Sequence, residues 1–297
     1  MSLETTDYGP FGRCVRLAND TVDLLVTADI GPRIIRFGFL GDRNELAELA
    51  PATNDARVWN IYGGHRLWYA PEDRFRSYLP DNGASAFEEI PGGVRVTQPV
   101  EPQTGIQKQM DILLAATGAD VRVIHRIINY GVWTVELAPW ALSVMAAGGK
   151  AIIPIPPRGL HATHLLPSNT LTFWAYTDLS DPRWKFSTRY LCLSQDPASD
   201  ARYPQKFGIS SAPWAAYQNG DHVFLKEAAV VPGAKYPDMG SAIEIFTNNE
   251  MLEVETLAPL SLVPVGQSVE HVEDWHLLKG IPPLETDDDV DAHIAPR

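Results

Sequence analysis

The sequence predicts an all-β protein, and three observations lead to that prediction. Short apolar or alternating runs follow one another along nearly all of the 297 residues. These runs are bounded by turn-forming residues, and the chain holds 24 prolines and 22 glycines. No stretch of about 12 residues combines helical apolar spacing with helix caps. Such regular spacing of short strands is typical of a β-sandwich or barrel.

The expected strands run through the chain without a linker or a break in composition. They cover residues 22–27, 33–39, 93–97, 107–114, 121–129, 137–145, 171–176, 190–193, 222–226, 242–246 and 251–257. Residues 1–280 are therefore expected to form one large antiparallel β-sandwich domain. Residues 45–49 and the C-terminal tail are weak helix candidates. The tail, residues 281–297, contains the run ETDDDVD and is expected to be solvated, with disorder as an alternative.

Composition narrows the classes of function. A formal net charge of −13 argues against nucleic acid as a partner, because phosphate binding needs clustered Lys and Arg. No apolar run approaches the ~18 residues that cross a bilayer, so no membrane partner is expected. The N-terminus lacks the features of a signal peptide, and Cys14 and Cys192 lack metal-type spacing. We interpret the protein as cytoplasmic with reduced thiols, and its ligand as a neutral or mildly polar small molecule.

The strand at residues 251–257 (MLEVETL) is the most informative segment. Alternation places Glu253, Glu255 and Leu257 on one face of this strand. Most other strands are apolar, so a row of glutamates indicates the floor of a polar cleft. A carboxylate fixed on a strand in a cleft is suited to proton transfer.

At this strand the sequence resembles the galactose mutarotase-like (aldose 1-epimerase-like) superfamily. The family's catalytic glutamate lies in a late strand reading roughly L-E-T-Q, soon followed by proline, and residues 254–259 read VETLAP. Residues 262–268 (LVPVGQS) and 273–277 (EDWHL) are similar to the segment and closing strand that follow. The similarity covers roughly residues 10–280 and is closest to an uncharacterised bacterial branch. It implies a large antiparallel β-supersandwich, with Glu255 as the catalytic base.

Residues 63–72 (GGHRLWYAPE) form a second dense motif. Aromatic rings stack on the C–H faces of a sugar, and forked donors and acceptors bind its hydroxyls. Arg66, Trp68 and Glu72 are therefore candidate substrate-binding residues. The alternative is a packed turn, with Trp68 in the core and Arg66 paired to Glu72 or Asp73.

His65 is our candidate for the general acid, since an imidazole with a pKa near ~6.5 can exchange protons at neutral pH. His125 is the competitor, although a lone histidine in an apolar strand is more often a satisfied core residue. The family's catalytic histidine follows a mid-chain β-run, and Trp140 stands at the matching position here. The usual acid is therefore missing or has moved.

Three further residues near the glutamate strand, Lys226, Tyr236 and Asp238, are candidate substrate-binding groups, as is Glu253 itself. Asp238 also suits a turn after Pro237, and Lys226 also suits an ordinary ion pair. In residues 178–184 (DLSDPRW), we expect an ordered loop in which Arg183 pairs with Asp178.

These features support three hypotheses. The first is an aldose 1-epimerase-like enzyme that interconverts the anomers of a free sugar or sugar derivative, with Glu255 as base and His65 as acid. It needs no metal or organic cofactor, and no cofactor motif appears. The second is a carbohydrate-binding protein without catalysis, which Trp140 favours because an indole cannot transfer a proton. The third is lyase or hydrolase chemistry by Glu253 and Glu255, or by Glu72. The oligomeric state is not determined by these patterns.

Overall fold

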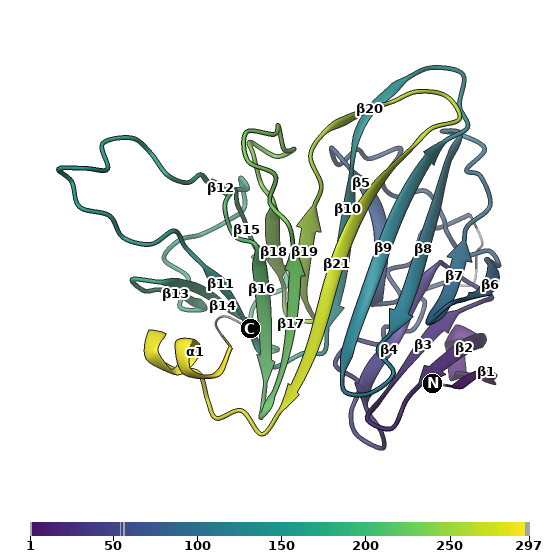
Figure 1. The fold of residues 1–297 in the computed structure, drawn as a ribbon, viewed down its shortest axis with the longest axis horizontal. Helices are drawn as coiled ribbons and strands as arrows, with labels where there is room; N and C mark the ends of the chain where they lie inside the picture. The colour runs from purple at the N-terminus through teal and green to yellow at the C-terminus, as the bar shows by residue number, and fades with distance from the viewer. Residues whose placement is uncertain (1, 54, 56, 295–297) are drawn as a thin grey trace.

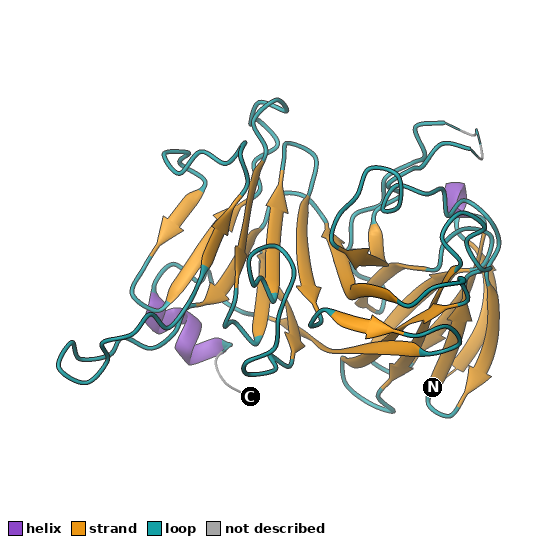
Figure 2. Cartoon of the chain, turned by 90° about the horizontal axis from the view of Figure 1, so that it is seen from above, coloured by secondary structure: helices purple, strands orange, loops and turns teal. Residues whose placement is uncertain are grey.

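The protein is built from two large antiparallel β-sheets that pack face to face (Figure 1). The computed structural model describes residues 2–53, 55 and 57–294. Within these residues, regular helix is confined to the 3-10 turn Gly9–Phe11 and helix α1 (Asp287–His293). Figure 2 shows that strands form almost all the rest of the regular structure, with α1 at one end of the molecule. The all-β prediction is confirmed.

The first sheet has eleven strands and carries the glutamate strand at its centre. Their order is β1 (Ser2–Asp7), β2 (Arg13–Ala18), β3 (Val22–Thr27), β4 (Arg33–Phe39), β5 (Gly64–Ala70), β10 (Val135–Met145), β19 (Leu252–Leu257), β18 (Ile243–Thr247), β15 (Gln205–Ile209) and β12 (Leu171–Phe173), and β20 (Ser261–Val263) pairs with β10. Strands distant in sequence thus become neighbours, and β5, β10 and β19 lie side by side.

The second sheet has ten strands and covers one face of the first. Their order is β13 (Trp184–Phe186), β14 (Tyr190–Ser194), β11 (Lys150–Pro154), β16 (Trp214–Asn219), β17 (His222–Ala228), β21 (Ser268–Lys279), β9 (Asp120–Asn129), β8 (Ile106–Leu114), β7 (Gly93–Thr97) and β6 (Ala86–Ile90).

One apolar core fills the space between the sheets. It joins Leu24 and Val254 of the first sheet to Ile112 and Trp275 of the second. Trp275 is among the largest fully buried side chains, and its ring meets Phe37 from the opposite sheet at 5.9 Å between centroids. Burial of this area from water is the main term that holds the two sheets together.

Two local expectations are corrected. Residues 45–49 form no helix; isolated bridges instead pair Leu46 with Met145 and Glu48 with Gly63. The strand expected at residues 171–176 ends at Phe173, and the chain then turns, so that Tyr176 reaches the pocket described below. Tertiary pairing decides both cases, because short segments have weak intrinsic preferences.

The acidic segment after residue 280 contains a short helix, and its Glu285, Asp288 and Asp291 remain exposed to solvent. A capping box between Thr286 and Asp289 starts helix α1. The carboxylates in its first turn interact favourably with the positive end of the helix dipole. Val290 and Ile294 are buried in a small apolar cluster with Tyr190 of β14. Residues 295–297 of the expected tail lie outside the described residues. Neither helical segment among the described residues has the length and apolar character needed to cross a membrane.

Candidate functional site

The two faces of the central strands of the first sheet have different roles. On β5, Leu67 and Tyr69 point into the core between the sheets, whereas Trp68 packs on the opposite face with Trp140 of β10. The register places Arg66 opposite Leu142, and Leu142 opposite Glu255. Side chains at directly paired positions share a face. Arg66, Trp68, Glu253 and Glu255 therefore lie on the outer face, as the alternation along β19 predicts.

A pocket of about 220 Å³ opens on this outer face. Its volume is below the ~300–1,000 Å³ of sites for drug-sized ligands, so it suits a single small ring. A larger hollow of about 380 Å³ lies beside Asp81 and Glu101, but these carboxylates are already paired with Arg33 and Lys108. The smaller pocket is lined by Trp59, Ile61, Arg66, Trp68, Glu72, Tyr78, Trp140, Leu142, Tyr176, Lys206, Phe246, Met251 and Glu253.

Aromatic rings form one wall of the pocket. Trp68 lies at the centre of this wall, with ring centroids 5.5 Å from Trp59, 5.1 Å from Tyr78 and 5.4 Å from Trp140. The Tyr78 hydroxyl donates a hydrogen bond to Glu72 Oε1 at 2.5 Å. Such tilted and edge-on packing leaves some ring faces for a ligand.

Arg66 brings a positive charge to the aromatic wall. Its guanidinium lies 4.5 Å from the centre of the Trp68 ring and donates from Nη2 to Glu253 Oε1 at 3.0 Å. Its Nε and Nη1 are buried and have no hydrogen-bond partner among the described residues. Buried donors are normally satisfied, so this fork has capacity for a ligand's oxygen atoms.

Beneath the pocket, one ammonium lies between two carboxyl groups; Lys206 lines the pocket, whereas Glu244 and Glu255 are fully buried behind the lining residues and form what we call its floor. Glu244 of β18 and Glu255 of β19 are directly opposite in the register. Lys206 Nζ lies 2.9 Å from Glu244 Oε2 and 3.1 Å from Glu255 Oε2. Trp140 Nε1 also donates to Glu255 Oε2, at 2.8 Å. Like charges opposite each other destabilise a sheet, and Lys206 removes that repulsion.

Burial and mutual charge shift the pKa values of Glu244, Glu255 and Lys206. Burial raises the pKa of Glu255, and Lys206 offsets only part of that rise. Burial raises the pKa of Glu244 further, to well above its ordinary value. Burial alone would lower the pKa of Lys206, but the two glutamates hold it well above the ordinary range. Glu255 Oε1 and Glu244 Oε1 lack a hydrogen-bond partner among the described residues, and Glu244 Oε2 contacts Lys206.

His65 lies on the other face of β5, within the core. Its Nδ1 is 2.9 Å from Ser143 Oγ and its Nε2 is 2.8 Å from His125 Nε2. Both imidazoles are completely buried, and burial lowers the pKa of each. The expectation that His65 protonates a sugar in the pocket does not fit this placement. His125 is the satisfied core residue described as the alternative.

Lys226 is also a core residue and not part of the pocket. It extends from β17 of the second sheet and donates to the carbonyl oxygens of Ala141 and Val254, each at 3.1 Å. Its Nζ lies 2.8 Å from Glu273 Oε1. Lys226 therefore ties together β10 and β19, the strands that carry Trp140 and the glutamates.

The buried group of His65, His125 and Glu273 has ligand atoms close enough to hold a metal ion, all within 4.8 Å of one another. Lys226 already neutralises Glu273, so a divalent ion would leave excess positive charge in the core. The arrangement therefore fits a hydrogen-bonded core network better than a metal centre.

Tyr236 and Asp238 lie outside the pocket lining as well. The Tyr236 hydroxyl is buried and accepts a hydrogen bond from the backbone N–H of Val231 at 2.9 Å. Asp238 has a φ of 48°, which fits the turn described as its alternative role. Its charge contributes to the raised pKa of Glu244. Of the predicted binding residues, Arg66, Trp68, Glu72 and Glu253 line the pocket.

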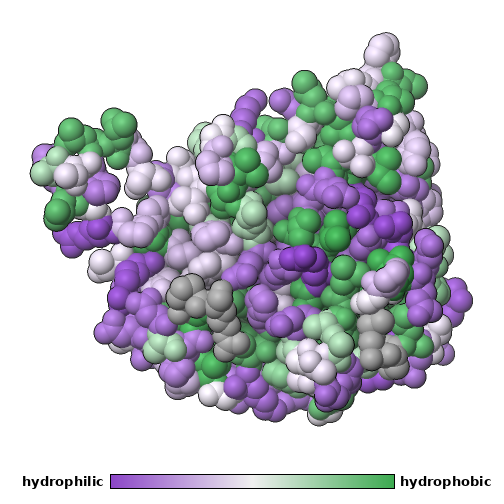
Figure 3. All heavy atoms as spheres, viewed as in Figure 1, coloured by the Kyte–Doolittle hydropathy of each residue, from purple (hydrophilic) through white to green (hydrophobic). Residues whose placement is uncertain are grey.

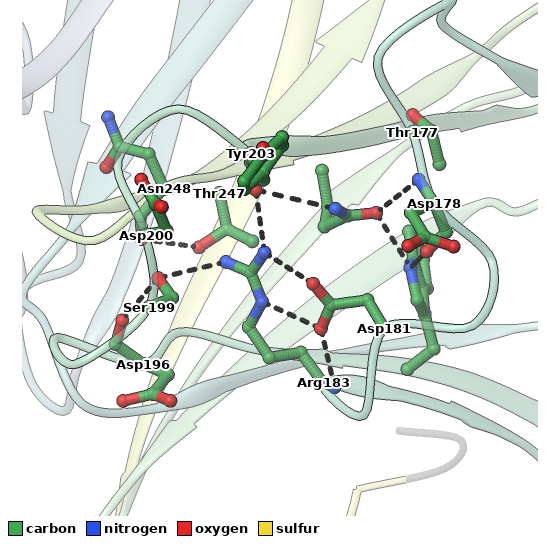
Figure 4. A network of polar contacts seen from close by, with 12 residues as sticks. Thr177, Asp178, Asp181, Arg183, Asp196, Ser199, Asp200, Tyr203, Thr247 and Asn248 are labelled. Carbon is green, nitrogen blue, oxygen red and sulfur yellow. Dashed lines mark hydrogen bonds and ion pairs between the residues drawn. The ribbon is translucent and has the colours of Figure 1, made fainter.

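A network of polar contacts centred on Arg183 and Asp181 lies in the loops that lead to the pocket (Figure 4). Arg183 pairs with Asp181, with Nη2 at 2.8 Å from Oδ2, and not with Asp178 as expected from the sequence. It also donates to the carbonyl oxygen of Tyr203 at 2.9 Å. The Thr177 hydroxyl donates to the carbonyl oxygen of Lys206 at 2.6 Å. The network thereby fixes the segment after Tyr176 against the start of β15.

The sequence interpretation missed Lys206, Glu244, Tyr78 and Tyr176. One signal was available for Glu244, because alternation along residues 242–246 places it with Phe246 on one face. Two neighbouring strands with carboxylates on the same face need a cation between them. Which lysine supplies it depends on the pairing of β15 with β18, which the sequence does not reveal.

Comparison with solved structures gives the fold. A galactose mutarotase-like protein from Lactobacillus casei superposes with a TM-score of 0.60 and 11% identity, covering 89% of this chain and all of its own. A galactose mutarotase-like protein from Clostridium acetobutylicum superposes with a TM-score of 0.57 and 10% identity, covering 94% of this chain and 99% of its own. A galactose mutarotase related enzyme from Lactobacillus acidophilus superposes with a TM-score of 0.52 and 7% identity, covering 90% of this chain and 98% of its own. The chain has the galactose mutarotase-like fold.

No protein-family model matches the sequence, and no curated protein is similar to it. At identities this low, the galactose mutarotase-like fold establishes architecture but not activity. The function has to be argued from the pocket on the outer face of β5, β10 and β19.

Proposed function

We propose that the protein binds a monosaccharide-sized sugar in the pocket and interconverts its anomers. The observation that carries this proposal is the pair Glu244 and Glu255, which share Lys206 and keep unpartnered oxygens beneath an aromatic wall. Arg66, Glu253 and Glu72 would bind hydroxyls, and the indoles would stack on the ring.

The two carboxyls suit the two proton transfers of ring opening. Glu255, with the smaller rise in pKa, would accept the proton of the anomeric hydroxyl. Glu244, with the larger rise, would hold a proton at neutral pH and donate it to the ring oxygen. Both oxygen atoms are bonded to the same sugar carbon, and paired positions on adjacent strands have Cβ atoms ~5 Å apart. The ring opens, the C1–C2 bond rotates, and reclosure with the roles reversed gives the other anomer.

The proposed acid replaces His65, because the core side of β5 offers no path to the pocket. Lys206 would keep Glu255 available as a base and would remain charged through the cycle. One acid and one base of this kind each typically contribute a factor of ~10²–10⁴ to the rate.

A second candidate function is sugar binding without catalysis. It is favoured by the complete burial of the Glu255 side chain and by Trp140, which occupies the family's histidine position and donates to that carboxylate. On this view Glu244, Lys206 and Glu255 only support the floor of the pocket.

NMR measurement of anomer exchange separates the two functions. A panel of aldohexoses and aldopentoses would be tested for binding by calorimetry and for exchange rate with wild-type protein, Glu255→Gln and the exposed control Glu250→Gln. We expect Glu255→Gln to lower the exchange rate by ~10²–10⁴ while a sugar still binds, and Glu250→Gln to leave both unchanged.

Undiminished exchange in Glu255→Gln would rule out Glu255 as the base. Saturable binding by the wild type with no exchange above background at any pH would identify the binding protein. Failure of every sugar to bind would remove the carbohydrate proposal altogether.

A further inference from the structure

Residues 155–170, which we call the arm, project from the body of the molecule between β11 and β12 (Figures 1 and 3). Leu160, Leu165 and Leu166 of the arm are between 73% and 84% exposed. Figure 3 shows hydrophobic residues gathered toward its end. Loops longer than ~12–15 residues without regular structure are uncommon and are usually functional. Leucines held away from their own core indicate a surface that another molecule covers.

The arm leads into a part of the sandwich where both sheets end. β12 is the last strand of the first sheet, and β13 is the last strand of the second. Leu171 and Phe173 of β12 and Phe186 of β13 are exposed. Edge strands with free backbone groups and apolar side chains are prone to pair with another chain unless they are covered. The exposed apolar side chains of the arm, β12 and β13 therefore lie at the same end of the two sheets.

Charge at this end of the molecule is divided between two elements. The arm contains Arg158, His161 and His164 and no carboxylate, in a chain with a net charge of −13. Helix α1, at the same end in both ribbon views, carries acidic residues through its first turn and the exposed Asp291 (Figures 1 and 2). The arm and the acidic helix thus lie at the same end of the molecule, and the helix keeps excess negative charge because one cation, Arg189, pairs with Asp287, Asp288 and Asp291.

We propose that this surface is the interface of a homodimer, in which the arm of each chain lies on the β12–β13 end and helix α1 of the other. A two-fold interface uses the same patch on both subunits, so the patch must complement itself. An arm with one arginine and no carboxylate, at the same end of the molecule as a net acidic helix, meets that requirement, and the leucines supply the apolar contact. The acidic chain disfavours nucleic acid or an anionic membrane as the occupant.

Sedimentation and light scattering of the full chain test the proposal. We expect a particle of twice the 32.8 kDa chain mass at micromolar concentration. Hydrogen exchange in residues 155–173 should slow as the protein concentration rises, because dimerisation covers them. A wild-type protein that stays monomeric at all concentrations up to the millimolar range would overturn the proposal, including the case in which a different protein covers the arm.

Two matched variants locate the interface. Leu165→Ser with Leu166→Ser removes apolar contact from the arm, and Val132→Ser with Trp133→Ser removes equally exposed residues, 78–79% accessible, from the β9–β10 turn. We expect the first pair to raise the dimer dissociation constant ~100-fold and the second to leave it unchanged. Because all four positions are exposed, unchanged far-UV circular dichroism and melting temperature should confirm that both variants fold.

Charge reversal provides an independent test. Arg158→Glu should weaken the dimer, and the wild-type dimer should weaken with added salt, because exposed charge pairs are screened. A dimer that survives the leucine substitutions at wild-type affinity, or that the β9–β10 substitutions dissociate, would place the interface elsewhere and refute the proposal.

Discussion

At the scale of single residues, Lys206 decides the chemistry of the pocket. It is the cation between Glu244 and Glu255, and its ammonium also lies 4.8 Å from the ring of Trp140 and 4.7 Å from that of Trp174. A buried charge is tolerated only where opposite charges and hydrogen bonds surround it. Every group on the floor therefore depends on this one side chain.

Lys206→Met should destabilise the protein by ~3–5 kcal/mol at pH 7.5, because two buried carboxyls lose the one cation that contacts both of them among the described residues. The pKa values of Glu244 and Glu255 are already raised, and they would rise further. Between a glutamate's ordinary pKa and the raised folded value, the folded state binds more protons than the unfolded state, so stability increases as pH falls. Urea unfolding should show the deficit of the variant shrinking between pH 7.5 and pH 5.

The exposed Lys235→Met serves as the control for Lys206→Met and should change stability by less than ~0.5 kcal/mol at either pH. A Lys206→Met deficit that does not change with pH would contradict the assignment of two buried, unpaired carboxyls.

At the scale of elements, alternation along a strand explains both the success and the failure of the sequence interpretation. It placed Glu253 and Glu255 on one face of β19, where the structure has them. The same rule shows that Arg66 and His65, adjacent on β5, cannot face one pocket. The dense motif at residues 63–72 was treated as a single cluster, and that treatment put His65 on the wrong side of the sheet.

Partners from other strands were beyond the sequence. Lys226 lies on β17 of the second sheet, and only the packing of the sheets shows that it crosses the core to β10 and β19. Strand order is set by non-local pairing, which local patterns do not encode. The C-terminal tail was only a weak helix candidate because of its acidic composition, although Thr286 and Asp289 have the spacing of a capping box.

Lys226→Met tests whether the contacts of Lys226 with β10 and β19 stabilise the strands that carry the pocket residues. Removing the ammonium leaves Glu273 buried and unpaired, so we expect a loss of ~3–5 kcal/mol. Adding Glu273→Gln should recover a large part of that loss, because the remaining buried charge is removed. Denaturant unfolding of the wild type, both single variants and the double variant gives the coupling between the two residues. Strictly additive effects would show that the pair does not act as a unit.

At the scale of the whole molecule, the core between the sheets is unusual in holding titratable groups. Thr256 is hydrogen-bonded to both His271 and Glu273, and Trp275 Nε1 donates to Glu273 Oε2 at 2.8 Å. Burial lowers the pKa of His271 to about 3, and burial lowers those of His65 and His125 as well. The fold therefore holds these imidazoles in their neutral form.

This network contributes a loss of stability in mild acid, opposite in sign to the contribution of the raised pKa values of Glu244 and Glu255. Below the ordinary histidine pKa of ~6.5, the unfolded chain takes up protons that the folded core refuses, so stability falls as pH drops. Replacing His271 by Gln removes one such group and should reduce the loss between pH 7.5 and pH 4.5 by about 2–3 kcal/mol. Urea unfolding of both proteins at the two pH values measures this change in unfolding free energy. His65 and His125 remain in both proteins as an internal reference. An equal loss in wild type and variant would mean that His271 is charged in the fold.

The short path from β12 to the pocket has a thermodynamic consequence. Phe173 ends the edge strand, and Trp174 and Tyr176, immediately after it, form part of the surroundings of Lys206. Self-association at that edge and occupancy of the pocket would thus act on the same few residues. Linkage then requires reciprocity: if pairing of chains tightens the hold on a sugar by some factor, the sugar must strengthen pairing by the same factor. A protein arranged in this way would report the concentration of its ligand through its own state of assembly.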